Sequence, residues 1–267
     1  MNNYGSIFNN EVTVSKAAEA RQKAILDMLE KSGEVRLSDL CVNFPGVSEM
    51  TLRRDLAYFQ DMGVAFRTHG GARLREGRKS ETNFRLRETE NRAAKEYIAK
   101  LAIRYIRGKT VFLDSGTTMM AFARSLKTYD LDIVTTGPNI ALELAATSNS
   151  TFTLPGGRLN RHNLTVSGPM AVENMSKIDI ETAFMVASGY TAAAGFTCGS
   201  QSEAELKKVI ISRAERKILL MDSSKFGKDM LFSFAELKDI QCFITDARPD
   251  GPFLKAAQEF GTRVVWE

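Results

Sequence analysis

The sequence predicts an α/β protein with a small, mainly helical N-terminal domain followed by a larger, mostly parallel α/β domain. Two observations carry this prediction. Residues 47–72 read as a capped helix, a turn and a short basic strand, whereas apolar strand patterns alternate with helical patterns from residue 109 onward. At 267 residues the chain is also longer than one typical domain. We expect a flexible tail at 1–18, a first domain at 19–75, a linker at 76–92 and a second domain at 93–267.

Charge is concentrated in one short stretch of the chain. Residues 53–79 hold seven Lys or Arg and three Asp or Glu, an excess equal to the net charge of +4 of the whole sequence. A local basic excess is what attraction to phosphate groups requires. The three cysteines and two histidines have no metal-ligand spacing, so neither a metal nor a cofactor is expected. Because the sequence has no signal peptide pattern and no apolar run of membrane-spanning length, we expect a cytoplasmic protein without a membrane partner.

The N-terminal domain is predicted to be a winged helix-turn-helix. Apolar residues within 21–31 form one helical stripe that Gly33 ends, and Ser38 precedes a second short helix that Pro45-Gly46 breaks. Ser48 is then expected to cap a third helix by accepting a hydrogen bond from the amide of residue 50 or 51. Residues 64–68 have strand character, and together with residues 35–37 they predict a wing of two or three strands. The third helix should bury Leu52, Leu56 and Phe59.

The exposed side of the third helix and the wing supply the candidate DNA contacts. The first turns of a recognition helix can reach base edges in the major groove, where Arg pairs with guanine and hydroxyls contact bases or phosphates. Taken alone, Arg53 and Arg54 could form a solvated basic face of the helix. For His69, a role as an ordinary turn residue is nearly as well supported as a DNA contact. Asp55 is expected to pair within the protein. The predicted DNA-binding residues are Ser48, Glu49, Thr51, Arg53, Arg54, Arg67 and His69.

Seven apolar segments in the second domain predict strands, and helical patterns separate most of them. This alternation is typical of a parallel sheet with helices on both faces. The predicted strands are 111–113, 133–135, 152–154, 183–186, 218–220, 243–244 and 264–265, and the predicted helices lie near 118–127, 138–147, 168–176, 202–215 and 250–260.

Polar loops that follow these strands predict a small-molecule site. Asp114-Ser115-Gly116-Thr117-Thr118 follows one strand and opens a helix, which suits a phosphate group, and open α/β sheets bind ligands at the carboxyl ends of their strands. Lys225 would supply a point charge, and Asp114 or Asp222 could accept hydroxyl groups. Alternatively, Asp222 caps a helix and Lys225 is solvated. The predicted effector-binding residues are Asp114, Ser115, Gly116, Thr117, Thr118, Asn139, Gly156, Gly157, Gly189, Asp222 and Lys225.

Several motifs, in this order and spacing, resemble the DeoR-type bacterial transcriptional regulators from about Arg21 to Asp246. They are VSEMTLRRDL at 47–56, RTHGGA at 67–72, LDSGTT at 113–118, LPGG at 154–157 and MDSSKFG at 221–227. The resemblance implies a winged helix that binds double-stranded operator DNA, usually to repress a sugar-catabolic operon. It also implies a sensor domain similar to ribose-5-phosphate isomerase that binds a phosphorylated sugar, in a homo-oligomer (dimer or tetramer).

Three functions remain open at this point. The favoured function is a non-enzymatic repressor that a phosphorylated sugar relieves. The alternative is a sugar-phosphate isomerase or deaminase with a DNA-binding head, in which Glu203 or Glu205 would act as general base. An activator or architectural DNA binder without an effector is the third. Binding of phosphorylated sugars, with or without turnover, separates them.

Overall fold

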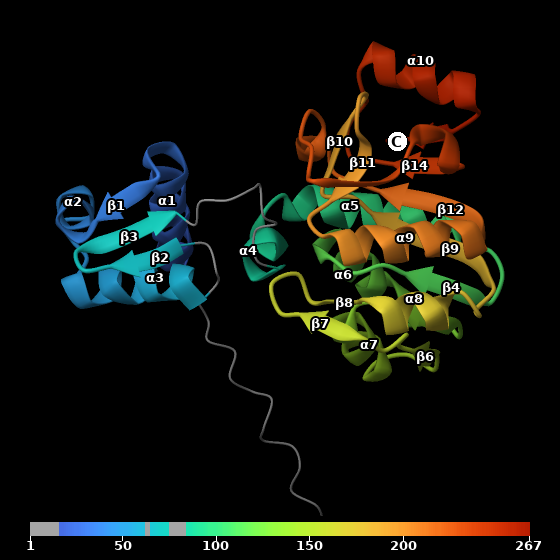
Figure 1. The fold of residues 1–267 in the computed structure, drawn as a ribbon, viewed down its shortest axis with the longest axis horizontal. Coiled ribbons are helices and arrows are strands. Elements are labelled where there is room, and N and C mark those ends of the chain that lie inside the picture. The colour runs from blue at the N-terminus through green and yellow to red at the C-terminus, as the bar shows by residue number, and fades with distance from the viewer. Residues whose placement is uncertain (1–15, 62–64, 75–83) are drawn as a thin grey trace, which may run out of the picture. The chain divides into compact units, whose positions relative to one another are not determined.

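The computed structural model in Figure 1 describes residues 16–61, 65–74 and 84–267, and it divides into two compact units at residues 76 and 77. Most of the predicted tail, the turn at Gly63 and the first part of the predicted linker lie outside the described residues. Within the described ranges, no helix is both long and apolar enough to cross a bilayer.

The first unit consists of three helices and a three-stranded antiparallel sheet in which β3 lies between β1 and β2. The predicted wing is therefore confirmed and has three strands. Pairing of Val35 with Ala72 and of Arg67 with Ala72 across the sheet fixes its register. The elements are α1 (Lys16–Ser32), β1 (Glu34–Arg36), α2 (Leu37–Asn43), α3 (Glu49–Asp61), β2 (Ala65–Thr68) and β3 (Gly71–Leu74).

The core of the first unit forms where the apolar stripes of the helices meet. Leu52, Leu56 and Phe59 on α3 are buried as predicted, together with Ile25 and Leu29 of α1. Asp55, on the same side of α3, is 3% exposed. Its carboxylate accepts hydrogen bonds from Arg21 Nε at 2.6 Å and from Gln22 Nε2 at 2.9 Å. The prediction that Asp55 pairs within the protein is confirmed, and this pair fastens α3 to α1.

The second unit is built on a seven-stranded sheet in the order β15-β14-β12-β9-β4-β5-β6, and every neighbouring pair is parallel. All seven predicted strands are found in it. The chain moves from β4 toward one edge through β5 and β6, and later fills the other side through β9, so the direction of winding reverses between β4 and β9. The strands are β4 (Thr110–Leu113), β5 (Asp132–Thr135), β6 (Thr151–Thr153), β9 (Ile180–Val186), β12 (Ala214–Leu220), β14 (Cys242–Ile244) and β15 (Arg263–Val265).

Alternating strand residues divide the interior into two apolar clusters, one on each face of the sheet. Phe112 and Met185 contribute to one cluster, and Leu113 and Phe184 to the other. The first cluster includes buried residues of α8 (Pro169–Met175), α9 (Gln201–Arg213) and α10 (Gly251–Phe260). The second includes residues of α5 (Arg92–Ala102), α6 (Thr117–Ala123) and α7 (Pro138–Ala145). The predicted covering of both faces is confirmed.

Short elements that the sequence does not predict complete the second unit. Strands of three or four residues rich in Gly, Ser and Thr have no clear periodicity, which explains why they are missed. They form an antiparallel sheet of β10 (Gly189–Thr191), β11 (Gly195–Cys198) and β13 (Phe232–Ala235), and a hairpin of β7 (Arg158–Asn160) and β8 (Thr165–Ser167). The short 3-10 helices are η1 (Ile103–Tyr105), η2 (Arg124–Leu126), η3 (Ser223–Lys225) and η4 (Leu237–Asp239).

A helix also stands where the sequence predicts linker. Residues 84–89 form α4 (Phe84–Thr89), which belongs to the second unit. Phe84 is 4% exposed and packs into the cluster that contains α5 and α6. A buried aromatic side chain within a highly charged stretch therefore anchors this helix. The sequence suggests one helix near 84–106, whereas the structure has two, α4 and α5, with a break between them.

Candidate functional sites

The start of α3 presents the predicted cap and the predicted DNA-contacting side chains. Ser48 Oγ accepts a hydrogen bond from the amide of Thr51 at 3.2 Å, and the two hydroxyl oxygens lie 2.8 Å apart. The cap is therefore confirmed. It fixes where the helix begins, and so which side chains occupy the first two turns.

Charged side chains around this cap are open to solvent. Arg53 pairs with Glu49 one turn earlier at 2.6 Å, whereas Arg54 points from the neighbouring position of the same exposed side. On the wing, Arg67 of β2 and His69 of the following turn are exposed. Met50, which sequence analysis passed over, is 61% exposed in the first turn, where an apolar side chain can contact a thymine methyl group.

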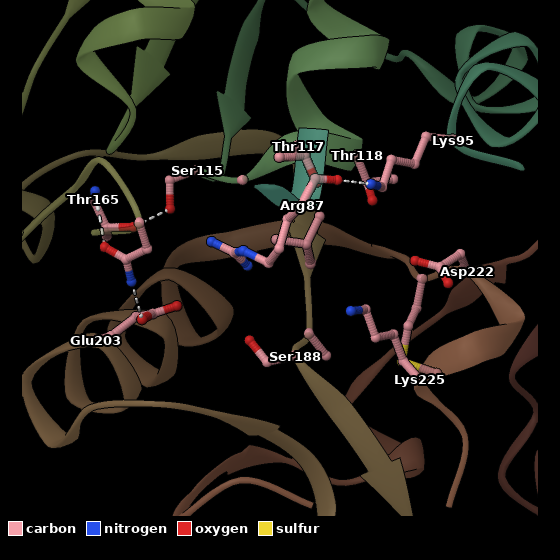
Figure 2. A pocket seen from close by; sticks show the side chains of 15 residues that line it. Arg87, Lys95, Ser115, Thr117, Thr118, Thr165, Ser188, Glu203, Asp222 and Lys225 are labelled. Carbon is pink, nitrogen blue, oxygen red and sulfur yellow. Dashed lines mark hydrogen bonds between the residues drawn. The ribbon is translucent and has the colours of Figure 1, made fainter. Parts of the chain in front are cut away.

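In the second unit, a cavity lies at the carboxyl ends of β4, β9 and β12, next to the point where the winding of the sheet reverses. Open α/β sheets bind their ligands at such a place. Figure 2 shows Arg87, Lys95 and Lys225 approaching the cavity from one side and Glu203 from the other. The lining residues are Arg87, Lys95, Ser115, Gly116, Thr117, Thr118, Asn163, Thr165, Val186, Ala187, Ser188, Glu203, Met221, Asp222 and Lys225.

Six of the predicted effector-binding residues line this cavity: Ser115, Gly116, Thr117, Thr118, Asp222 and Lys225. The other five lie elsewhere. Asn139 is in the first turn of α7, and Gly156 lies near Met170 of α8. A Cβ atom on Gly157 would stand 2.6 Å from the Ser167 carbonyl oxygen, and one on Gly189 would stand 2.3 Å from that of Lys228. Both glycines therefore permit close backbone packing around the site without lining it.

Asp114, the fifth, lies behind the cavity wall and joins three elements. Its carboxylate accepts from the Ser115 amide at 2.8 Å and from the Val186 amide at 3.0 Å, which ties the end of β4 to the end of β9. It also forms an ion pair with Lys207 of α9. Burial lowers the pKa of Lys207, but the carboxylates of Asp114 and Glu203 outweigh it, so the net shift is upward. Lys207 is therefore a fixed positive charge beneath the cavity.

Two further cations at the cavity come from residues that sequence analysis missed. Lys95 on α5 donates hydrogen bonds from Nζ to the carbonyl oxygens of Arg87 and Glu90. Burial lowers its pKa to about 8, opposed by the Asp222 carboxylate and reinforced by the Lys225 charge. Arg87 extends from α4 toward the centre of the cavity (Figure 2). No motif marks these two residues, because α4 itself is hidden among charged neighbours.

The opposite wall of the cavity is polar. Glu203 is 6% exposed and accepts a hydrogen bond from Asn163 Nδ2 at 3.2 Å. Thr165 is 2.5 Å from Ser115 across the cavity floor, oxygen to oxygen. Between Asn163 and Thr165, Leu164 has a φ of 56°, a conformation that is costly for a branched side chain. Sequence analysis named Glu203 only as a candidate general base; its spacing from Lys207, one helix turn away, is a signal that could have linked it to this wall. Glu205, the other candidate base, is exposed and accepts from Gln201.

The two units together have the organisation of a DNA-binding regulator with a separate ligand-binding domain. A DeoR-like helix-turn-helix domain matches residues 21–78, and a DeoR C terminal sensor domain matches residues 90–247. The chain belongs to the DeoR family of transcriptional regulators.

Individual relatives agree with this assignment over nearly the whole chain. The HTH-type transcriptional regulator GlpR of Haloferax volcanii is 31% identical over 92% of this chain and 96% of its own. A putative aga operon transcriptional repressor of Escherichia coli is 29% identical over 96% of both chains. The lactose phosphotransferase system repressor of Staphylococcus epidermidis is 32% identical over 85% of this chain and 91% of its own. Ribose 5-phosphate isomerase A of Methanocaldococcus jannaschii is a structural neighbour, 18% identical with a TM-score of 0.38 over 51% of this chain and 55% of its own.

Proposed function

We propose that this protein represses a sugar-catabolic operon and that a phosphorylated sugar, bound in the second unit, releases it from operator DNA. The observation that carries the proposal is the composition of the cavity, in which three cations face a wall of hydroxyl, amide and carboxylate groups. Cations suit a phosphate group, and the polar wall suits the hydroxyl groups of a sugar. Relatives named as repressors of the aga operon and of the lactose phosphotransferase system support a sugar-related role.

In this proposal, the first turns of α3 enter the major groove. Bases and phosphates are contacted by Arg54, Ser48 and Thr51. Glu49 orients Arg53 through their ion pair. From the wing, Arg67 and His69 contact the DNA backbone. The chain acts as a homo-oligomer, a dimer or a tetramer. Paired heads then bind repeated half-sites, because a second contact on the same DNA molecule benefits from a high effective concentration.

The effector's phosphate group occupies the cationic side of the cavity, near Lys225 and the hydroxyls of Thr117 and Thr118. Asp114 contributes indirectly by holding β4 against β9, and Asn139, Gly156, Gly157 and Gly189 contribute through packing. Asp222 already accepts from the amide and hydroxyl of Ser224, so it orders the loop that carries Lys225. Glu203 and Asn163 therefore replace the two aspartates as the hydroxyl-binding groups.

Two substitutions test this division of labour. Genomic fragments bound by the purified full chain serve as operator, and a thermal-shift panel of pentose and hexose phosphates serves to find an effector. Arg54→Ala is expected to weaken operator binding at least tenfold, or about 1.4 kcal/mol, and to keep the thermal shift. Lys225→Ala is expected to do the reverse. If both folded variants lose both activities, the two-module account is wrong. If no member of the panel shifts the wild type, the DNA binder has no sugar-phosphate effector.

The placement of Glu203 favours one alternative function, a sugar-phosphate isomerase or deaminase with a DNA-binding head. A carboxylate in a cavity beside a buried lysine is a plausible general base for proton abstraction from a sugar. Incubation of the full chain with ribose 5-phosphate and with an amino-sugar phosphate distinguishes the two. Turnover that Glu203→Gln abolishes supports the enzyme, whereas stabilisation without turnover supports the sensor.

A further inference from the structure

Arg87 lies in a short segment that neither family match covers, since the matches end at residue 78 and resume at residue 90. Its side chain nevertheless lines the cavity, and its Nε atom is buried. Figure 2 shows the Arg87 side chain extending between Ser115 and Lys225. The helix that carries it, α4, is therefore part of the cavity wall.

The second cation of this wall is attached to the same helix. Lys95 Nζ donates to the carbonyl oxygens of Arg87 and Glu90, which belong to the carboxyl end of α4. A negatively charged ligand that attracts Lys95 competes with these carbonyl groups for the same ammonium. Both Arg87 and Lys95 thus connect the charge in the cavity to the position of α4.

Further contacts of α4 lie at its two ends and along the helix. At the start, the Phe84 side chain is buried and its amide donates to the His162 carbonyl oxygen at 2.7 Å. On the helix itself, Glu88 pairs with Arg124 at 3.0 Å in a half-exposed position, a kind of pair that contributes little to stability. After the end, Asn91 has a φ of 48° and donates to Asp222 and Ser224. A left-handed conformation is costly for a non-glycine residue, so α4 ends at a backbone position held by its surroundings.

The volume of the cavity requires some part of its wall to move. Only about 30 Å³ is free, whereas pockets for ligands larger than a few atoms hold about 300–1,000 Å³. The ends of β4, β9 and β12 lie in the middle of a parallel sheet. The polar wall of Asn163, Thr165 and Glu203 is held by hydrogen bonds among these residues and to Ser115. The six-residue α4 is the wall that can yield.

We propose that α4 is a ligand-operated lid. The anionic group of the effector binds Arg87 and Lys95, draws Lys95 away from the α4 carbonyl groups and so repositions α4. Because α4 is the first described element that follows the DNA-binding unit in the sequence, the state of the cavity reaches that unit through this helix. This lid rests on the proposed function and adds how binding of the effector is transmitted to the DNA-binding unit. A ligand shifts the two states only by its different affinity for each, and Arg87 and Lys95 provide that difference.

The test uses the full chain with inorganic phosphate and ribose 5-phosphate as probes. Hydrogen exchange over residues 84–90 and probe affinity are measured for the wild type, Arg87→Ala and Arg87→Lys. Arg85→Ala is the matched control, because Arg85 is on the same helix but is exposed and does not line the cavity. We expect either probe to change exchange over 84–90 in the wild type and in Arg85→Ala. Arg87→Ala should bind at least tenfold more weakly and lose the exchange change, and Arg87→Lys should be intermediate.

Each outcome decides the inference. The lid is contradicted if folded Arg87→Ala binds the probes with wild-type affinity. It is also contradicted if the wild type binds a probe without any change in hydrogen exchange over residues 84–90. If Lys225→Ala at the same time loses binding, the effector site stands without the lid. If the wild type binds neither these probes nor any sugar phosphate of the panel, both the effector site and the lid are wrong.

Discussion

Lys207 and Asp114 form an ion pair in which each side chain is about 2% exposed. The pair joins α9 to the end of β4, directly beneath the cavity. An isolated charge at this depth would be strongly unfavourable. Asp114 therefore depends on Lys207, and Lys207 depends on Asp114 together with Glu203 at 3.5 Å.

Removal of one member of this pair should therefore destabilise the second unit severely. We expect Lys207→Met to lower the free energy of unfolding by about 3–5 kcal/mol, because Asp114 and the buried Glu203 both lose the positive charge that they share. Denaturant titration measures this. The double variant Lys207→Met with Asp114→Asn should recover part of the loss. If the double variant lost more unfolding free energy than the two single variants together, this explanation would be contradicted.

The Arg21–Asp55 pair should matter for the first unit in the same way, though less. Asp55→Ala removes charged hydrogen bonds from Arg21 and Gln22, so we expect a loss of about 1.5–3 kcal/mol, followed by loss of DNA binding on warming. Glu49→Ala breaks the exposed pair with Arg53 and should cost at most about 1 kcal/mol. Melting curves of the full chain compare the stability of Asp55→Ala with that of Glu49→Ala. Equal losses of stability would show that the burial of Asp55 is unimportant.

The wing tolerates no side chain at Gly71. A Cβ atom there would lie 2.0 Å from the Val35 carbonyl oxygen and 2.9 Å from Arg36 Cα, whereas one at Gly70 would meet nothing within 4 Å. Gly71→Ala should therefore separate β1 from β3 and destabilise the first unit by about 1–3 kcal/mol or more. Gly70→Ala is the adjacent control. Thermal melts that show the same change for both substitutions would argue against close strand packing at Gly71.

Phosphate binding should weaken as the pH rises through about 8. Burial lowers the pKa of Lys95 to about 8, so Lys95 is positive below that pH and neutral above it. Phosphomonoesters are already doubly charged above pH 7, so the change reports the protein. Isothermal titration of ribose 5-phosphate from pH 7 to pH 9.5 measures it. Lys95→Met should bind weakly throughout and lose the step near pH 8; a step that persists in this variant would assign it to another group.

The strands of the parallel sheet were predictable even where they have three or four residues, because a strand packed on both faces leaves an apolar run. The cap at Ser48 was predictable from the type of residue at the helix start. Prediction failed for short elements that no apolar run or cap marks. Helix α4 has one buried apolar side chain, Phe84, and its other contacts join residues far apart in the sequence, so no period reveals it.

For the cavity, the loop after β4 was predictable because glycine and hydroxyl residues gather directly behind an apolar strand. The place of Asp114 behind the cavity was not predictable, because the sequence cannot show that it pairs with Lys207, far along the chain. Likewise, Arg87 and Lys95 reach the cavity only through the way α4 and α5 fold back onto the sheet. A ligand-binding loop can be recognised from its own residues, whereas side chains that reach the cavity from distant helices cannot.

The position of Arg87 has a consequence for the exchange of modules between related regulators. A hybrid joined at residue 90, where the sensor match begins, would take α4 from the donor of the head and could lose a cation of the cavity. A junction before Phe84 would keep the whole cavity with its own sheet. Hybrid regulators should therefore keep ligand binding when the junction lies before α4 and lose it when the junction lies after this six-residue helix.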